Sequence, residues 1–151
     1  MCERVPIFDS LTKKPKDIRK NMRKRFEQQR KLGVISISEV KLPLKSRDEL
    51  PPILRALQHI YVTPELNEKV FRILEEKVQK GKKKTGRYGM ELWHILVLSV
   101  VRLGLDADYD RLDDFANHHK LIRQILGVET TCGEGKRFSR QSIQDNVSLL
   151  D

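Results

Sequence analysis

The sequence of 151 residues contains only two cysteines, few aromatic residues and no long apolar run. Cys2 and Cys132 lie far apart and neither belongs to a Cys-x-x-Cys pair, which argues against a disulfide framework and a zinc ribbon. The longest apolar stretch is too short to span a bilayer, and the first residues lack the apolar core of a signal peptide. The composition therefore predicts a cytoplasmic protein that does not enter a membrane.

The short motifs of nucleotide-binding and hydrolytic enzymes are also missing, since no Gly-x-Gly-x-x-Gly, P-loop or Gly-x-Ser-x-Gly pattern occurs. No histidine has a His or Cys three or four residues away, as a metal site on one helix would need. Clustered aspartates crowd one predicted helix start, where carboxylates stabilise the helix dipole and cap free amides. They are Asp106, Asp108, Asp110, Asp113 and Asp114. We predict that this chain alone is not an enzyme and needs no cofactor.

Positive charge is what the sequence has in excess, with a formal net charge of +9. Lysines and arginines outnumber aspartates and glutamates by 11 to 4 in residues 1–33 and by 4 to 0 in residues 81–87. The counts are 8 against 7 in residues 34–80 and 7 against 10 in residues 88–151. Two basic blocks therefore carry the whole excess, which predicts a polyanionic partner. The alternative is that these blocks are solvated faces or arms without a partner.

The first basic block is predicted to form a helix over residues 16–31. Its apolar residues Ile18, Met22 and Phe26 recur every four positions and form one seam, which could serve as an interface but is too narrow for firm membrane insertion. Residues 34–42 alternate apolar and polar side chains, which permits one short strand or an extended linker.

Two helices are predicted in the middle of the chain. Ser46 and Glu49 match a capping box that would begin the first of them, which extends to about Tyr61. Thr63 is the expected N-cap of the second, with Pro64 at its first position. The predicted apolar face of that helix consists of Leu66, Val70, Ile73, Leu74 and Val78. We expect the two helices to pack as an antiparallel pair.

Residues 90–103 form the most hydrophobic part of the chain and are predicted to be a central core helix that stops at Gly104. His94 is expected in the core or at its edge. Asp108 or Asp110 would cap the next helix.

The C-terminal part is predicted to resemble a helix-turn-helix, because short helices there precede a final helix capped by Ser139. The buried stripe of that helix would be Ile143, Val147 and Leu150. On its outer face, Arg140, Gln141 and Gln144 are residue types that can read bases in the major groove, although any surface helix can carry them. The predicted phosphate contacts are Lys82, Lys83, Lys84 and Arg87 in a glycine-hinged loop and Arg19, Lys20, Arg23 and Lys24 on the arm.

Ordered matches along most of the chain carry a resemblance to a known family. They are Leu42–Pro52, Gly86-Arg87, Glu91–Leu96, Arg102–Leu112, His118-His119, Ile122–Gly127 and Phe138–Ile143. From Arg25 through Asp151 the chain resembles the N-terminal region of insertion-sequence transposases of the DDE class, in particular the ISNCY-type group. The resemblance implies a DNA-binding region that recognises terminal inverted repeats during transposition. It also implies a separate RNase-H-like domain beyond Asp151 that would hold the catalytic carboxylates and magnesium.

We therefore predict a small all-α protein with a basic N-terminal arm and linker over residues 1–45 and a helical DNA-binding domain over residues 46–151. Its expected partners are double-stranded DNA carrying inverted repeats and either a second copy or the full-length transposase. The expected location is the bacterial cytoplasm, at the nucleoid. Two alternatives stay open: a free-standing truncated regulator or inhibitor of transposition, and an unspecific RNA-binding or structural basic protein.

Overall fold

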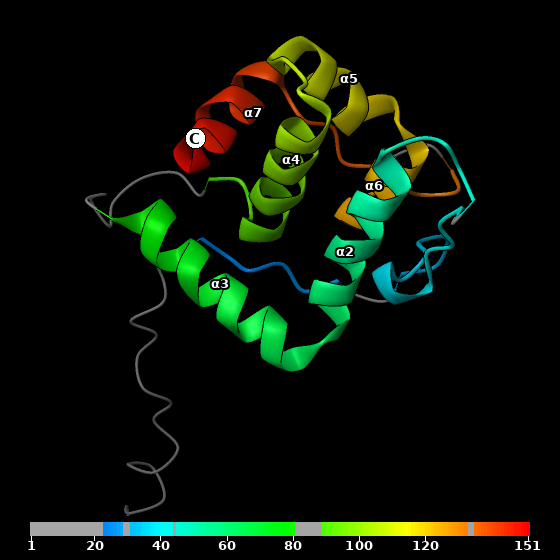
Figure 1. Cartoon of the computed structure of the whole chain (residues 1–151), viewed down its shortest axis with the longest axis horizontal. Coiled ribbons are helices and arrows are strands. Elements are labelled where there is room, and N and C mark those ends of the chain that lie inside the picture. The colour runs from blue at the N-terminus through cyan, green and yellow to red at the C-terminus, as the bar shows by residue number, and fades with distance from the viewer. Residues whose placement is uncertain (1–22, 29–30, 44, 81–88, 133–134) are drawn as a thin grey trace, which may run out of the picture.

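The structure, a computed structural model, describes residues 23–28, 31–43, 45–80, 89–132 and 135–151. Every regular element in these ranges is a helix (Figure 1). The α-helices are α2 (Leu50–Val62), α3 (Pro64–Gln79), α4 (Leu92–Leu105), α5 (Tyr109–His118), α6 (Lys120–Leu126) and α7 (Arg140–Val147). Two short 3-10 turns are η2 (Ile37–Glu39) and η3 (Ser148–Leu150). The predicted all-α fold class is confirmed.

Helix α4 lies at the centre of the fold and contacts each of the other five α-helices (Figure 1). Apolar side chains cover nearly its whole circumference, as expected for a helix surrounded by others. The predicted end at Gly104 was wrong, because α4 continues to Leu105 and ends with Asp106 in the left-handed conformation. Gly104 has a packing role instead, since a Cβ added there would collide with Ile53 of α2.

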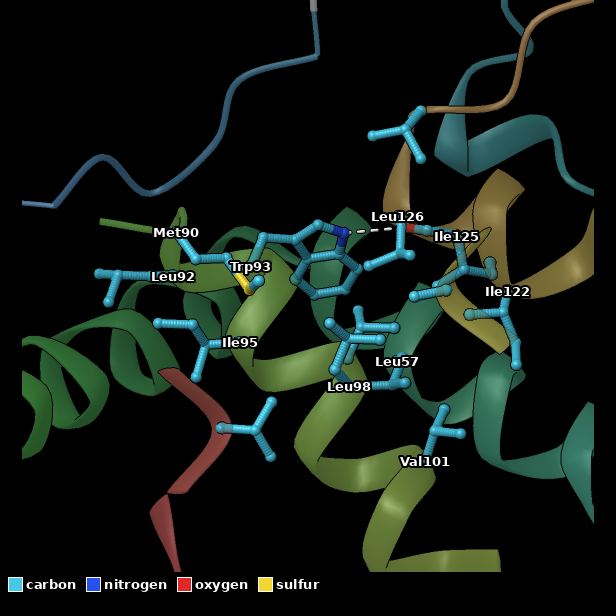
Figure 2. Close-up of a cluster of buried hydrophobic side chains, with 14 of the residues drawn as sticks. Leu57, Met90, Leu92, Trp93, Ile95, Leu98, Val101, Ile122, Ile125 and Leu126 are labelled. Carbon is cyan, nitrogen blue, oxygen red and sulfur yellow. Dashed lines mark hydrogen bonds between the residues drawn. The ribbon is translucent and has the colours of Figure 1, made fainter. Parts of the chain in front are cut away.

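Trp93 joins α4 to the end of α6. Its indole Nε1 donates a hydrogen bond to the carbonyl oxygen of Ile125 over 2.8 Å, and the ring is fully buried. Figure 2 shows this bond and the apolar side chains below the ring, among them Leu57 of α2 and Leu98 of α4. A buried indole needs such a partner for its N–H, so the bond fixes how α6 sits on α4.

Helix α2 begins later than the capping box predicted. The hydroxyl of Ser46 accepts a hydrogen bond from the backbone N–H of Asp48, and a carboxylate oxygen of Asp48 accepts one from Leu50. Two consecutive prolines, Pro51 and Pro52, fill the first turn, where their missing N–H groups cost nothing. The capping-box prediction was wrong. The two prolines favour the first turn of a helix, so the helix starts directly before them, at Leu50.

Helix α3 starts as predicted, with Thr63 before Pro64. Its buried side chains are Phe71, Leu74 and Val78, whereas Ile73 is 63% exposed. Phe71 packs near the indole of Trp93 in the core, with ring centroids 6.4 Å apart. The predicted face was therefore partly wrong, because the aromatic ring, and not Ile73, turns toward α4.

The C-terminal helices have the predicted caps. Asp108 accepts a hydrogen bond from the backbone of Arg111 at the start of α5, and Ser139 accepts one from Ser142 at the start of α7. Gly127 ends α6 with a φ of 74°.

The connection 127–139 between α6 and α7 is longer than the three- or four-residue turn of a helix-turn-helix. Packing against α4 and α5 places α7 instead.

Residues 23–28, which we call the strap, are not helical. The predicted helix over residues 16–31 is wrong for this part, and the predicted positions of Ile18 and Met22 lie outside the described residues. In Figure 1 the strap runs as an extended segment beside α3. Its polar groups bond to residues far along the chain, so tertiary contacts outweigh the local helical pattern.

Between the strap and α2, the linker alternative holds for residues 34–42, with only the turn η2 in this stretch. Ile37 and Val40 are buried in the same core as the helices. The side-chain amide of Gln58 on α2 donates to the carbonyl oxygens of both residues, at 2.8 Å and 3.0 Å. This linker is thus fastened to α2.

Candidate nucleic-acid interface

The described residues carry little of the excess positive charge. They hold 19 lysines and arginines against 17 aspartates and glutamates, whereas the whole chain holds 30 against 21. Six of the predicted DNA contacts lie outside the described residues: Arg19, Lys20, Lys82, Lys83, Lys84 and Arg87. The structure places the other five: Arg23, Lys24, Arg140, Gln141 and Gln144.

Residues of the first basic block contact residues that closely follow the second. The guanidinium of Arg23 donates through NH1 to the carbonyl oxygen of Met90 over 3.0 Å and to the side-chain oxygen of Asn146 on α7. The backbone N–H of Leu92 donates to the carbonyl oxygen of Lys24 over 2.9 Å. Arg23 belongs to the first block, and Met90 follows the second by three residues. We call the cluster formed by Arg23, Lys24, Gly89, Met90 and Asn146 the basic junction.

Arg23 is half-buried, and this burial lowers the pKa of its guanidinium. No carboxylate of the described residues lies within ion-pair distance of it. A Cβ added at Gly89 would overlap the guanidinium, so the glycine leaves the space that Arg23 occupies beside Met90. Among the described residues, Arg23 thus bonds only to neutral oxygens.

Arg25 fastens the strap to α3. Its Nε and NH2 donate to the two carboxylate oxygens of Glu75 at 2.6 Å and 3.0 Å, and its NH1 donates to Glu68 at 2.6 Å. These bonds raise the pKa of Arg25 and lower that of the Glu68 carboxyl. Two parallel bonds to one carboxylate fix the guanidinium in direction as well as in place.

The side chain of Phe26 packs against the core and anchors the strap there. Its backbone has a φ of 85°, which is unusual for a bulky residue. Its ring lies 4.7 Å from the imidazole of His94 and covers Gly127, where a Cβ would collide with it. His94 is 1% exposed and donates through Nε2 to the carbonyl oxygen of Leu126 over 2.9 Å. Burial, aided by the charge of Lys136, lowers the pKa of His94 to about 3, so the ring is neutral. The predicted core position of His94 is confirmed.

The predicted base-reading residues of α7 all have side-chain partners on the protein. Arg140 forms an ion pair with Asp110 of α5 and also donates to Gln144 over 3.4 Å. Gln141 donates to Asp145 over 2.7 Å. The polar groups on the outer face of α7 are therefore already bonded, Arg140 to a carboxylate of α5 and Gln141 to a carboxylate of α7 itself.

Three of the five clustered aspartates near α5 have ordinary structural roles. Asp108 caps α5, Asp110 pairs with Arg140, and a carboxylate oxygen of Asp113 accepts a hydrogen bond from Asn117. Within the described part of the chain, no group of three or more His, Cys, Asp or Glu residues could hold a metal ion. Nor does any helix in that part have the length and apolar character needed to cross a membrane.

Sequence reasoning missed the residue that holds the connection between α6 and α7. Arg123 is 5% exposed and bonds to Glu129 over 2.5 Å. It also donates to the carbonyl oxygens of Ala116, Val128 and Lys136. The sequence does contain one signal, an arginine inside the apolar run of α6. A cation is rarely buried unless it is fully paired, so an arginine at such a position indicates that it has partners.

A groove of about 980 Å³ lies between the strap and the connection that precedes α7. Arg23, Lys24 and Lys31 line one side of it, and Lys136 lines the other. The groove thus begins at the basic junction and continues onto the helical body.

Comparisons with protein-family models, with curated proteins and with solved structures found no match for this chain. The described residues define a small all-α fold in which Arg23 of the first basic block contacts both Met90, three residues after the second block, and Asn146 of α7.

Proposed function

We propose that the chain is the DNA-binding N-terminal region of a bacterial insertion-sequence transposase and binds the terminal inverted repeats of the element. The sequence resemblance suggests the family, and the basic junction is the observation that carries DNA binding. Arg23 of the first block bonds to Met90, which follows the second block by three residues, so the described chain next to both blocks lies at one place on the fold. In this proposal, cations of both blocks neutralise neighbouring phosphates of one duplex.

In this proposal, phosphate contacts and base reading belong to different parts. Arg19, Lys20, Lys24 and the cations of loop 81–87 grip the backbone. The residues Arg140, Gln141 and Gln144 of α7 read base edges once the duplex replaces their present partners. Arg23 links the two parts, since it bonds to α7 through Asn146.

Cutting and joining of DNA are not assigned to this chain. Transposases of the DDE class need carboxylates that hold magnesium, whereas Asp108 caps α5 and Asp110 and Asp113 bond to neighbouring side chains. The proposal therefore makes the chain a binding module that works in the bacterial cytoplasm on nucleoid DNA, as a second copy or a full-length transposase assembles on the same ends.

Binding to labelled duplexes tests the proposal. One duplex carries the inverted repeats that flank the gene, and a matched duplex carries the same bases in scrambled order. Both are titrated across a salt series. We expect tighter binding to the inverted repeats and a steep loss of affinity with salt for both duplexes. Equal affinity at every salt concentration contradicts recognition of the repeats, and absence of binding at low salt contradicts DNA binding.

A further inference from the structure

The groove beside the strap combines cations from segments that are distant in sequence. Lys24 lies on the strap, Lys31 lies after it, and Lys136 lies just before α7. All three side chains are exposed, and among the described residues none has a carboxylate within ion-pair distance. The ammonium group of Lys136 also lies 5.4 Å from the centroid of the Phe138 ring, a contact that uses none of its hydrogen-bond donors. A ligand in the groove can therefore bind all three ammonium groups.

The carboxylates of the groove only partly balance these cations. Glu75 is already occupied by Arg25, which leaves Glu27 and Glu91. Four groove cations remain after that pair is set aside, namely Arg23, Lys24, Lys31 and Lys136. The net charge left in the groove is positive, which favours an anionic ligand.

The groove is large as well as positively charged. The volume, about 980 Å³, lies at the upper end of the range of about 300–1,000 Å³ that small-molecule sites occupy.

We infer that this groove holds a stretch of the sugar-phosphate backbone of the bound DNA, with Lys24, Lys31 and Lys136 as phosphate contacts. The inference rests on the proposed DNA binding and adds a surface of the helical body to it. Arg23 belongs to both the basic junction and the groove, so a strand bound at the basic junction continues into the groove. If the ligand were an acidic protein, the groove would not need to be continuous with the basic junction.

Two triple variants with the same change in net charge test the inference. The groove variant is K24Q/K31Q/K136Q. The control is K41Q/K45Q/K69Q, which removes three exposed lysines that do not line the groove. Duplex binding is measured by fluorescence anisotropy across a salt series for the intact chain and both variants. We expect the groove variant to bind on the order of tenfold more weakly than the control. Its salt slope should fall by about 0.9 for each of three lost contacts.

A third variant, K24R/K31R/K136R, keeps the charges and should keep the affinity, and thermal unfolding of every variant shows that each is folded. If the intact chain binds the duplex but the groove and control variants bind equally, the groove inference is overturned and DNA binding stands. That same result is expected if the groove serves an acidic protein. If the intact chain binds no duplex at low salt, the proposed function itself is wrong.

Discussion

The strap and the outer face of α7 both carry arginines, yet these arginines have partners of opposite kinds. Arg23 on the strap bonds to a carbonyl oxygen and an amide oxygen, both neutral. Arg140 on α7 bonds to the carboxylate of Asp110, and Gln141 beside it bonds to Asp145. Of the carboxylates that the structure describes, none is paired with Arg23 and would compete with a phosphate there, whereas a phosphate that approaches α7 must displace carboxylates.

This difference assigns separate tasks to the two regions within the proposed function. The basic junction and the groove supply affinity, because phosphate contacts there cost little rearrangement. The α7 face supplies selectivity, because its side chains exchange their protein partners only for well-placed base edges. Arg25 is an exception on the strap, since it is paired with two glutamates and serves as an anchor.

The largest effect is expected on the free energy of unfolding, when a buried arginine and a partly exposed arginine are each replaced. The buried one is Arg123 and the partly exposed one is Arg25 of the strap. R123M removes the partner of Glu129 and three bonds to backbone carbonyl oxygens in a buried site. We expect it to lower the free energy of unfolding by about 3–5 kcal/mol. R25M removes a pair that is one-third exposed, so the expected loss is only about 1 kcal/mol.

Urea unfolding of both variants and the intact chain measures this difference. Because both substitutions remove one arginine, they are matched in net charge. Equal losses of stability for R123M and R25M would contradict the prediction that the buried ion pair of Arg123 contributes more than the partly exposed ion pairs of Arg25.

His94 lies where the two regions meet, between Phe26 of the strap and Phe138 before α7. Its pKa is lowered from 6.5 to about 3, so the folded protein resists protonation of this ring. The resulting stability is complete above pH 6.5 and is lost as the pH falls toward 3. Near pH 4.5 we expect a loss of roughly 2–3 kcal/mol relative to neutral pH from this group.

The variant H94Q isolates that contribution, because glutamine can still donate to the carbonyl oxygen of Leu126 but does not titrate. Urea unfolding at neutral pH and near pH 4.5 should show a smaller acid-induced loss in H94Q, by about the same amount. If the two proteins lose equal stability on acidification, His94 is not the group responsible.

A smaller effect is expected from the outer face of α7. R140A/Q141A/Q144A should reduce the preference for inverted-repeat over scrambled duplex by on the order of tenfold, since each base contact is worth roughly 1–3 kcal/mol. The salt slope should fall by no more than about 1, because at most one cation is removed. Titration of both duplexes provides both numbers. An unchanged preference together with a reduced slope would make Arg140 a phosphate contact and remove base reading from α7.

The helical part of the fold follows closely from local sequence. Thr63, Asp108, Gly127 and Ser139 mark helix ends where the sequence predicts them, because capping depends on neighbouring residues. The apolar run around Trp93 likewise predicts the central helix. These features need no knowledge of distant contacts.

The candidate site could not be derived in the same way. The strap is extended because Arg25 reaches Glu68 and Glu75, and because Arg23 reaches Met90. These partners lie 43 to 67 residues away in sequence, so the local helical pattern gave the wrong conformation. The groove depends on the same long-range contacts, and Lys31 and Lys136 were therefore not predicted as site residues.

The convergence of the two basic blocks on one duplex is the central claim, and the salt dependence of binding tests it most directly. The measurement compares the intact chain with R19Q/K20Q, with K82Q/K83Q and with the variant that combines all four substitutions. We expect each pair to lower the salt slope by about 2 and the combined variant by about 4, since each lost phosphate contact contributes about 0.9. A slope that either pair leaves unchanged would contradict binding of one duplex by both blocks.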